Sequence, residues 1–291
     1  MAHLRWWAAL LFLTTLACAV SIPTSQPLTI IETVEQTQSW SLAGASRAQV
    51  RLRMLSGDFV LQPWDASLQV ATAFRYNVEE WAPQITQTMQ NTNARLTVNQ
   101  GIGTQLAFGG EEFVNAWNVA LPHDVPIDLG VDLGAGMATL DLGGISLSDL
   151  GVTAANADMT LTFTETNPEP LGLLRVTAGT GNLNLRDLGN ANFDRLSLIG
   201  GAGTVQADFG GAWTRSAVAD VRAGAGQVTL RVPATLGVRI NYTTTPMSAL
   251  TLNGFVEQSD NVYVNAAYGE SSITLTINLT AGIGAVTLTS E

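Results

Sequence analysis

The chain has few side chains that could act as a catalytic nucleophile or base. After His3 the only histidine is His123, which follows a proline, and the only cysteine is Cys18. A Ser–His–Asp or Cys–His device would have to use His123, but no Gly-x-Ser-x-Gly motif is present to supply a nucleophile. Zinc sites built from several His or Cys ligands are excluded by count. We interpret His123 as a solvated loop residue.

The sequence contains no lysine, and this absence removes further chemistry. Without lysine there is no phosphate-binding P-loop, no Schiff-base amine and no lysine general base. Gly-x-Gly sequences recur, but they lack the third glycine and the strand-to-helix context of a dinucleotide site. We therefore predict no cofactor.

Two acidic clusters stand beside aromatic residues, as in glycan-cleaving sites. Glu79 and Glu80 precede Trp81, and Glu111 and Glu112 precede Phe113. Paired carboxylates can serve as acid and base on a glycosidic bond, but both clusters lie outside the regular repeats, where loop or cap edges are the favoured interpretation. A sugar-stacking platform is a further alternative to ordinary packing for four tryptophans, Trp64, Trp81, Trp117 and Trp213.

Calcium is worth testing because the chain is acidic and glycine-rich. The sequence Gly200-Gly201-Ala202-Gly203 continues with Thr-Val, so the ligand position of the calcium-binding nonapeptide is apolar. No EF-hand pattern is present. Stacked repeats could still bring together Asp132 with Asp158, or Asp141 with Asp208. A solvated acidic face is the favoured interpretation, and we predict no metal site.

The formal net charge is −11 and charged residues make up only 13% of the chain. A protein this acidic is repelled by nucleic acid and by anionic lipid surfaces. On the same ground we expect no polyphosphate or polyuronate ligand unless a metal mediates.

The most regular feature of the sequence is a short repeat that occurs five times between residues 129 and 230. Each copy has an alternating apolar run, a tight corner of small residues, and a second alternating run. The corners are Gly134-Ala135-Gly136, Ala155-Asn156-Ala157, Gly179-Thr180-Gly181, Gly201-Ala202-Gly203 and Gly224-Ala225-Gly226. Their last residues step by 21, 24, 22 and 23 positions. A fixed period of this size indicates stacked units with one shared core.

The alternation and the period together predict the fold class. Every second side chain of each run would point inward, and glycine at the corner would permit a sharp bend close to the neighbouring backbone. We predict an all-β, single-stranded β-helix (β-solenoid) with parallel coil stacking and about 22 residues per coil. The ends would expose strand edges and need caps. We expect those caps in the N-terminal third and in residues 249–268.

The N-terminus has the features of an export signal. The apolar run 6–16 is too short to span a bilayer. It leads to Ala17-Cys18-Ala19, which fits ordinary signal peptidase and also an imperfect lipobox with Cys18 as the acylated residue. We predict four segments: 1–18, a signal or lipoprotein signal peptide; 19–30, a tether; 31–120, an N-terminal β region; and 121–291, the repeat solenoid with its C-terminal cap.

Several phrases around the corners resemble the bacterial toast-rack family. They are Trp117-Asn118-Val119-Ala120-Leu121, Val125-Pro126-Ile127-Asp128-Leu129, Leu133-Gly134-Ala135-Gly136, Leu140-Asp141-Leu142-Gly143-Gly144, Leu188-Gly189-Asn190-Ala191-Asn192-Phe193, Gly200-Gly201-Ala202-Gly203 and Asp208-Phe209-Gly210-Gly211. The resemblance covers residues 50–288, approximately. The toast-rack family is itself similar to the C-terminal domain of LiaF-type cell-wall-stress proteins and to adhesin-like proteins. It implies a fold and carries no catalytic residues. The chain departs from LiaF-type proteins in its signal-like N-terminus.

These observations favour a non-enzymatic protein, exported and either lipid-anchored on the outer face of the bacterial membrane or secreted. We expect an adhesin-like or envelope-stress interaction module that displays residues 165–170 and 187–193 to an unknown protein or glycan, with no nucleic-acid partner. The alternatives are a carbohydrate-active β-helix enzyme and a structural surface protein that assembles through its coil ends.

Overall fold

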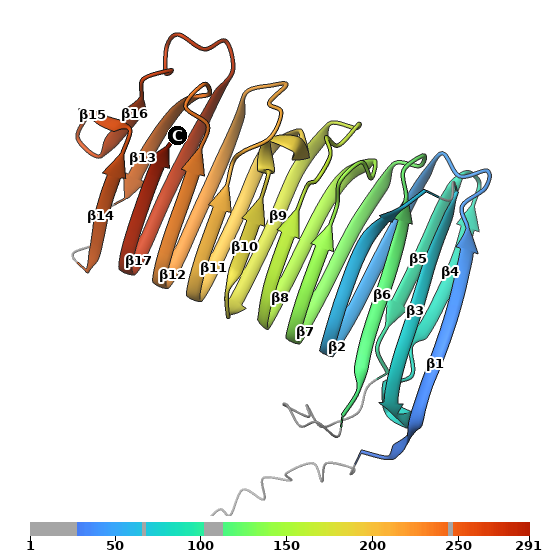
Figure 1. Cartoon of the computed structure of the whole chain (residues 1–291). Coiled ribbons are helices and arrows are strands. Elements are labelled where there is room, and N and C mark those ends of the chain that lie inside the picture. Colours follow the sequence, from blue (N-terminus) through green and yellow to red (C-terminus); the bar gives the residue numbers. More distant parts are fainter. Residues whose placement is uncertain (1–27, 66–67, 102–112, 244–246) are drawn as a thin grey trace, which may run out of the picture.

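The computed structural model describes residues 28–65, 68–101, 113–243 and 247–291, and it is built from strands (Figure 1). Two short 3-10 turns, η1 (Glu79–Trp81) and η2 (Leu188–Ala191), interrupt them. The all-β prediction is confirmed. Nowhere in these ranges is there a helix with the length and hydropathy needed to cross a bilayer.

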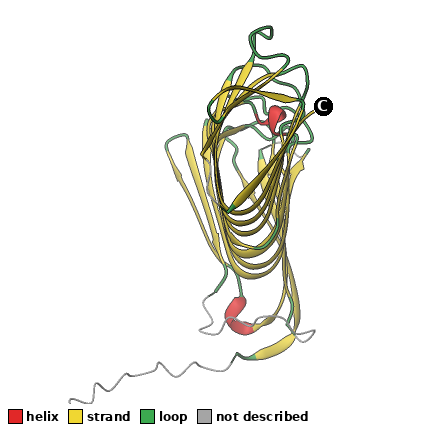
Figure 2. Cartoon of the chain, turned by 90° about the vertical axis from the view of Figure 1, so that its left-hand side faces the viewer, coloured by secondary structure: helices red, strands yellow, loops and turns green. Residues whose placement is uncertain are grey.

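The middle of the molecule consists of long strands that bend at their midpoints. Seen from the end, they nest as a series of U shapes (Figure 2). They are β2 (Arg47–Trp64), β7 (Ile127–Asp141), β8 (Leu147–Thr162), β11 (Phe193–Asp208), β12 (Ala217–Val232) and β17 (Thr274–Ser290), with one more U divided into β9 (Leu171–Thr180) and β10 (Leu183–Arg186). Each strand thus contributes one arm to each side of a flattened stack.

Neighbouring U-shaped strands pair in parallel, and equivalent residues of successive repeats are the partners. Leu129 pairs with Leu150, Leu150 with Leu174, and Leu174 with Leu196. All four side chains are buried, so one apolar row runs from repeat to repeat. Rows from both arms meet between the two sides and form one continuous core.

The corners explain how an arm reverses direction while its apolar residues stay inside. Leu129, Val131 and Leu133 are buried before the first corner, and Ala138 and Leu140 after it, so the inward positions change from odd to even numbers. A glycine with φ between 129° and 135° allows this change at most corners, namely at Gly57, Gly136, Gly203, Gly226 and Gly284.

Neighbouring corners also lie so close together that there is no room for a side chain, which is a second reason for glycine at these positions. A Cβ placed on Gly203 would overlap the carbonyl oxygen of Gly181, and one on Gly226 would overlap that of Gly203. Gly134, Gly179, Gly201 and Gly224 meet the carbonyl of the preceding corner in the same way. The corner at Ala157 is different, because it has no glycine and no positive φ.

The N-terminal end of the stack is closed by strands on the far side of β2. They are β1 (Ile30–Ser41), β3 (Gln69–Val78), β4 (Gln84–Gln90), β5 (Asn93–Asn99) and β6 (Asn115–Pro122). β5 and β6 pair in parallel with the two arms of β2, while β4, β3 and β1 extend these arms in antiparallel pairing.

One part of this region differs from expectation. The sequence predicts an irregular turn or a short helix across 79–93, whereas the structure has a 3-10 turn followed by strand β4. β4 is exposed except at Ile85, which packs against the core, and it has no apolar alternation. β4 is a strand because it pairs with β5, and its local sequence has no pattern that would predict this pairing.

At the C-terminal end, chain order and stack order differ. β17 pairs directly with β12, and the earlier strands β13 (Gly237–Thr243) and β14 (Ser248–Asn253) lie on its outer side. β16 (Val262–Asn265) and β15 (Phe255–Ser259) continue from β13 in antiparallel pairing. The strands β13 to β16 therefore form an excursion to the end of the stack, which explains why the repeat is blurred after Pro233 and returns in β17.

Each side of the stack is thus a broad sheet. The first side is formed by the arms that precede the corners, in the order β4-β5-β2-β7-β8-β9-β11-β12-β17-β13-β16-β15. The second side, formed by the arms after the corners, runs β1-β3-β6-β2-β7-β8-β10-β11-β12-β17-β14.

Candidate functional site

His123 is held by backbone groups and has no nucleophile on its ring. Its Nδ1 lies 2.9 Å from the carbonyl oxygen of Gly144, which can only accept, so Nδ1 carries the proton. Nε2 lies 3.6 Å from a carboxylate oxygen of Asp65. The nearby Ser146 hydroxyl donates to the backbone carbonyl of His123 and not to the ring. This arrangement links a turn and does not activate a serine.

The first acidic cluster also has a structural role. The Glu80 carboxylate accepts hydrogen bonds from the backbone nitrogen and the hydroxyl of Thr29, at 3.1 and 2.8 Å. The bond from the Thr29 backbone, followed by that from its hydroxyl, lowers the pKa of Glu80 below its ordinary value. Trp81 is buried and packs against Phe113. Glu111 and Glu112 lie outside the described residues.

The tryptophans do not gather into a sugar-stacking surface. Trp117 is buried and meets Phe74 edge to face. Trp213 packs edge to face on Phe193 and donates its ring N–H to the carbonyl of Phe209. These are packing contacts that satisfy the polar edge of each ring.

The acidic pairs considered for calcium are not brought together. Asp132 lies on the first side and Asp158 beyond the corner on the second. Asp141 is separated from Asp208 by the intervening rows of β8 and β10, where Thr162 pairs with Arg186. Across the described ranges, no three His, Cys, Asp or Glu side chains form a group that could hold a metal ion.

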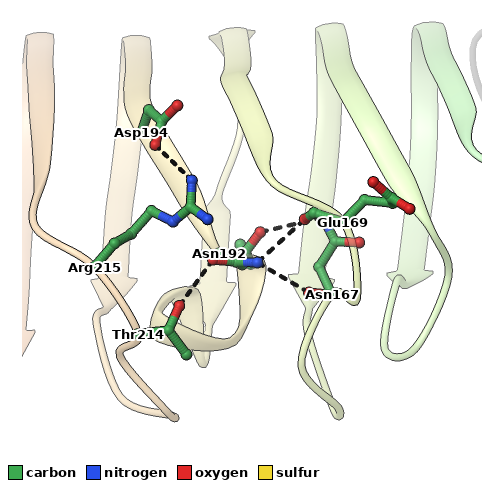
Figure 3. A network of polar contacts seen from close by, with 7 residues as sticks. Asn167, Glu169, Asn192, Asp194, Thr214 and Arg215 are labelled. Carbon is green, nitrogen blue, oxygen red and sulfur yellow. Dashed lines mark hydrogen bonds and ion pairs between the residues drawn. The ribbon is translucent and has the colours of Figure 1, made fainter.

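The two loops expected to display residues are tied to one another. Asn192 donates to the carbonyls of Asn167 and Glu169, both at 3.2 Å, and accepts a 2.9 Å bond from the Thr214 hydroxyl. Figure 3 shows Asn192 of the second loop between Asn167 and Glu169 on one side and Thr214 on the other, with the Arg215–Asp194 ion pair beside it. Asn167 itself is fully buried. Hydrogen bonds therefore hold the two loops together, and Leu188 and Phe193 of the second loop belong to the core.

The largest concentration of charge lies elsewhere, on the outer surface of the first side. Of the arginines in the described part of the chain, eight occupy outward positions there: Arg47, Arg51, Arg53, Arg95, Arg175, Arg195, Arg222 and Arg239. We call this surface, from β5 to β13, the arginine face. Most of these residues alternate with buried apolar neighbours, as Arg175 does with Leu174 and Val176, and this alternation directs them outward.

Five aspartates share the arginine face, namely Asp128, Asp132, Asp149, Asp194 and Asp220. Arg51 pairs with Asp128 at 2.8 Å, and Arg195 with Asp220 at 3.3 Å. Arg53, Arg95 and Arg222 form no ion pair within the ranges that the structure describes. Positive charge is therefore in excess on this face.

A polar groove of about 700 Å³ opens at the N-terminal end of the arginine face. Its charged lining residues are Arg47, Arg95, Asp128 and Asp149. Partial burial opposes ionisation of Asp128, but hydrogen bonds from Arg51 and Gln49 outweigh it and hold the pKa of this carboxyl below its ordinary value. The carboxylate thus stays ionised.

Asp149 stands next to Asp128 in the parallel register of β7 and β8. Partial burial, followed by the negative charge of Asp128, raises the pKa of Asp149 above its ordinary value, although Arg175 and Arg51 oppose this. The groove therefore combines guanidinium groups, one firmly ionised carboxylate and one carboxylate that takes up a proton more readily. Such a site suits a polar, charged ligand.

The arginine face is not apparent from net charge or from any single repeat, and it was not among the sequence-based expectations. A signal was nevertheless present: arginines recur at outward positions of the arms that precede the corners. Only the stacking of distant repeats turns these scattered positions into one surface. The sequence-predicted Cys18 lies outside the described residues.

Comparison with known proteins gives a family and a fold. The sequence profile described as the N-terminal domain of toast_rack matches residues 30–173 and 167–231. No curated protein has a sequence that matches this chain. A solved structure of a candidate cell adhesion protein from Clostridium sporogenes is 20% identical, with a TM-score of 0.50, and covers 89% of this chain and 100% of its own. A candidate adhesin from Bacteroides fragilis is 12% identical, with a TM-score of 0.38, and covers 88% and 97%.

Proposed function

The chain belongs to the toast-rack family, and from this premise we propose that it is a non-enzymatic, adhesin-like binding module at the bacterial cell surface. The observation that carries the proposal is the arginine face, a broad charged surface on a framework of paired strands. The name of the Clostridium sporogenes protein, a candidate for cell adhesion, agrees with it.

We further propose that the chain is a rigid β-solenoid with coils of about 22 residues. The parallel pairing of equivalent residues in successive U-shaped strands supports this architecture. In this proposal, residues 1–18 direct export, 19–30 form a tether, 31–120 start and cap the stack, and 121–291 form the repeats and the second cap. A lipid on Cys18 would hold the stack on the outer face of the membrane.

The absence of an assembled catalytic group in the described ranges supports a binding role. His123 bonds to a backbone carbonyl, Glu80 bonds to Thr29, and Trp81, Trp117 and Trp213 each pack against a neighbouring ring. A role in sensing envelope stress is compatible with the same surface, since recognition of an envelope component would be its first step.

The test has a binding arm and a turnover arm. The purified protein is incubated with isolated bacterial cell walls and, separately, with membrane vesicles, and the bound fraction is measured by co-sedimentation. Released reducing and unsaturated sugar ends are measured in the same samples. We expect binding without release. Release of sugar ends would overturn the non-enzymatic proposal, and failure to bind any envelope fraction would overturn the surface role.

The anchor is tested on the expressed full chain by labelling with palmitate. Incorporation that is lost in Cys18→Ala supports the lipid anchor. Equal labelling of both chains, or no labelling of either, contradicts it.

A further inference from the structure

We propose that the arginine face binds a linear acidic polysaccharide, with carboxylates of the polymer on the arginines and sugar hydroxyls on the polar side chains between them. This inference rests on the proposed surface role and names the class of ligand. It reverses the expectation drawn from net charge, because a charge of −11 is an average over a surface that is not uniform.

Charge is segregated between the two sides of the stack. The arginine face has eight arginines and five aspartates, a formal excess of three positive charges. The arms after the corners have the opposite balance. Asp58, Asp141, Asp158 and Asp208 outnumber Arg186 and Arg231 there. An anionic ligand is therefore attracted to one side and repelled from the other.

The arrangement of the strands favours a long ligand that crosses them. Neighbouring strands lie about 4.8 Å apart, so the surface from β5 to β13 extends for about 40 Å along the stack. Arginines occur on most strands along this path and are separated by one to three strands. A polymer chain laid across the strands would pass guanidinium groups at intervals of roughly 5 to 15 Å, and the groove beside Arg47 and Arg95 gives it a recessed end.

The side chains between the arginines suit sugar rather than lipid or base. Thr153, Thr177, Ser197, Thr276 and Asn278 are outward-facing and partly or fully exposed, and they can exchange hydrogen bonds with hydroxyl groups. Guanidinium groups bind carboxylates through paired hydrogen bonds. The polar surface thus matches a polymer that alternates hydroxyl-rich rings with carboxylates.

Two features disfavour nucleic acid. Asp128, Asp149 and Asp220 stand among the arginines and would repel a polymer with a charge every ~1.7 Å, whereas a sparsely charged glycan can avoid them. No aromatic residue occupies an outward position on the described pre-corner arms from β5 to β13, so unpaired bases would find nothing to stack on there.

The experiment uses the full chain and polygalacturonate as the probe, with dextran, duplex DNA and anionic phospholipid vesicles as comparison ligands. Affinity is measured by titration calorimetry at low and at near-physiological salt. We expect binding of polygalacturonate that weakens as salt rises, because the contacts are screened charges, and no binding of dextran. Tighter binding of DNA or vesicles than of polygalacturonate would overturn the proposal.

Matched double variants locate the site. Arg175→Gln with Arg222→Gln removes two exposed arginines from the arginine face, and Arg186→Gln with Arg231→Gln removes two from the opposite side. Both pairs change net charge equally. We expect the first pair to lose about tenfold in affinity and the second less than twofold, since each exposed contact contributes modestly. Equal losses would mean that net charge alone governs binding, which contradicts the proposal.

A variant that is expected to bind more tightly completes the test, because a misfolded protein would not gain affinity. Asp149→Asn removes a negative charge from the groove and is expected to raise affinity about two- to threefold; an unchanged or lower affinity contradicts the proposal. Failure here is distinguishable from failure of the surface role. If cell walls still sediment the Arg175→Gln, Arg222→Gln chain as well as the original, the surface role survives and the arginine face is not its site.

Discussion

Individual residues in this protein are constrained most strongly where neighbouring backbones approach one another. Gly203 combines a φ of 129° with a position directly against the carbonyl of Gly181. Either feature alone disfavours a side chain, and together they leave no space into which a methyl group could relax. The glycine is therefore required by geometry at this corner.

Replacing Gly203 with alanine is predicted to destabilise the fold by about 2 kcal/mol or more, since strain and overlap add. Valine at the same position is expected to cost more. Gly172→Ala is the control, because a Cβ added to that glycine would meet no atom within 4 Å and its φ is not positive. Chemical denaturation measures both. A Gly203→Ala chain as stable as the control would contradict this role for the corner.

Asp149 offers a prediction about pH. Its pKa is raised in the folded state by burial and by Asp128, so its contribution to stability is present below the ordinary value of 3.8 and is lost as pH rises through the folded-state pKa. At neutral pH the ionised carboxylate is therefore unfavourable. Asp149→Asn is predicted to raise the free energy of unfolding at pH 7, by less than about 1 kcal/mol because solvent screens the pair.

The gain from Asp149→Asn should disappear near pH 3, where the original side chain is itself protonated. Thermal unfolding at the two pH values measures the difference. Asp132→Asn is the matched control, an exposed aspartate on the same face. A gain for Asp149→Asn that is as large at pH 3 as at pH 7 would show that like-charge repulsion is not its cause.

At the level of elements, the loops that join the arms are aligned by side-chain amides. Asn167 accepts a 2.9 Å hydrogen bond from the backbone nitrogen of Leu147 and donates to the carbonyls of Leu147 and Ala191, at 2.9 and 3.3 Å. One buried amide thus joins three successive repeats, and it satisfies backbone groups that parallel pairing leaves open.

Asn167→Ala is predicted to destabilise the protein by about 2 to 4 kcal/mol, because buried backbone groups lose their partners. Thr166→Ala is the control, since the Thr166 hydroxyl is exposed and makes only a long 3.5 Å contact with Asn190. Denaturant unfolding compares the two variants. If both have the same small effect, water replaces the amide and the loop alignment does not depend on it.

The repeat strands could be predicted because each has a recognisable pattern in its own local sequence. Leu129 and Val131 alternate with outward residues, and the corner glycines mark the reversal. Strand β4 and the place of β13 and β14 outside β17 could not, because both depend on pairing between distant segments. The arginine face could not be predicted from the sequence for the same reason. Arg53 and Arg222 share a surface only after the intervening repeats have stacked.

At the level of the whole molecule, stability depends on contacts between repeats. A single U-shaped strand buries its apolar arms only when a neighbour covers them, and the core continues without a break from the N-terminal strands to β17. Neither end has a core of its own. The two ends are therefore expected to lose structure together.

Thermal unfolding is predicted to show one transition seen alike by probes at different places. Trp213→Phe leaves, among the described residues, only tryptophans located in β1, β2, η1 and β6, which report on the N-terminal part of the stack. Far-ultraviolet circular dichroism reports on all strands. The two melting curves of this variant should coincide, because disruption at one end exposes the apolar rows of the next repeat. A fluorescence transition several degrees away from the dichroism transition would mean that the N-terminal strands form a separate cooperative unit, and the continuous core would not be what couples the repeats.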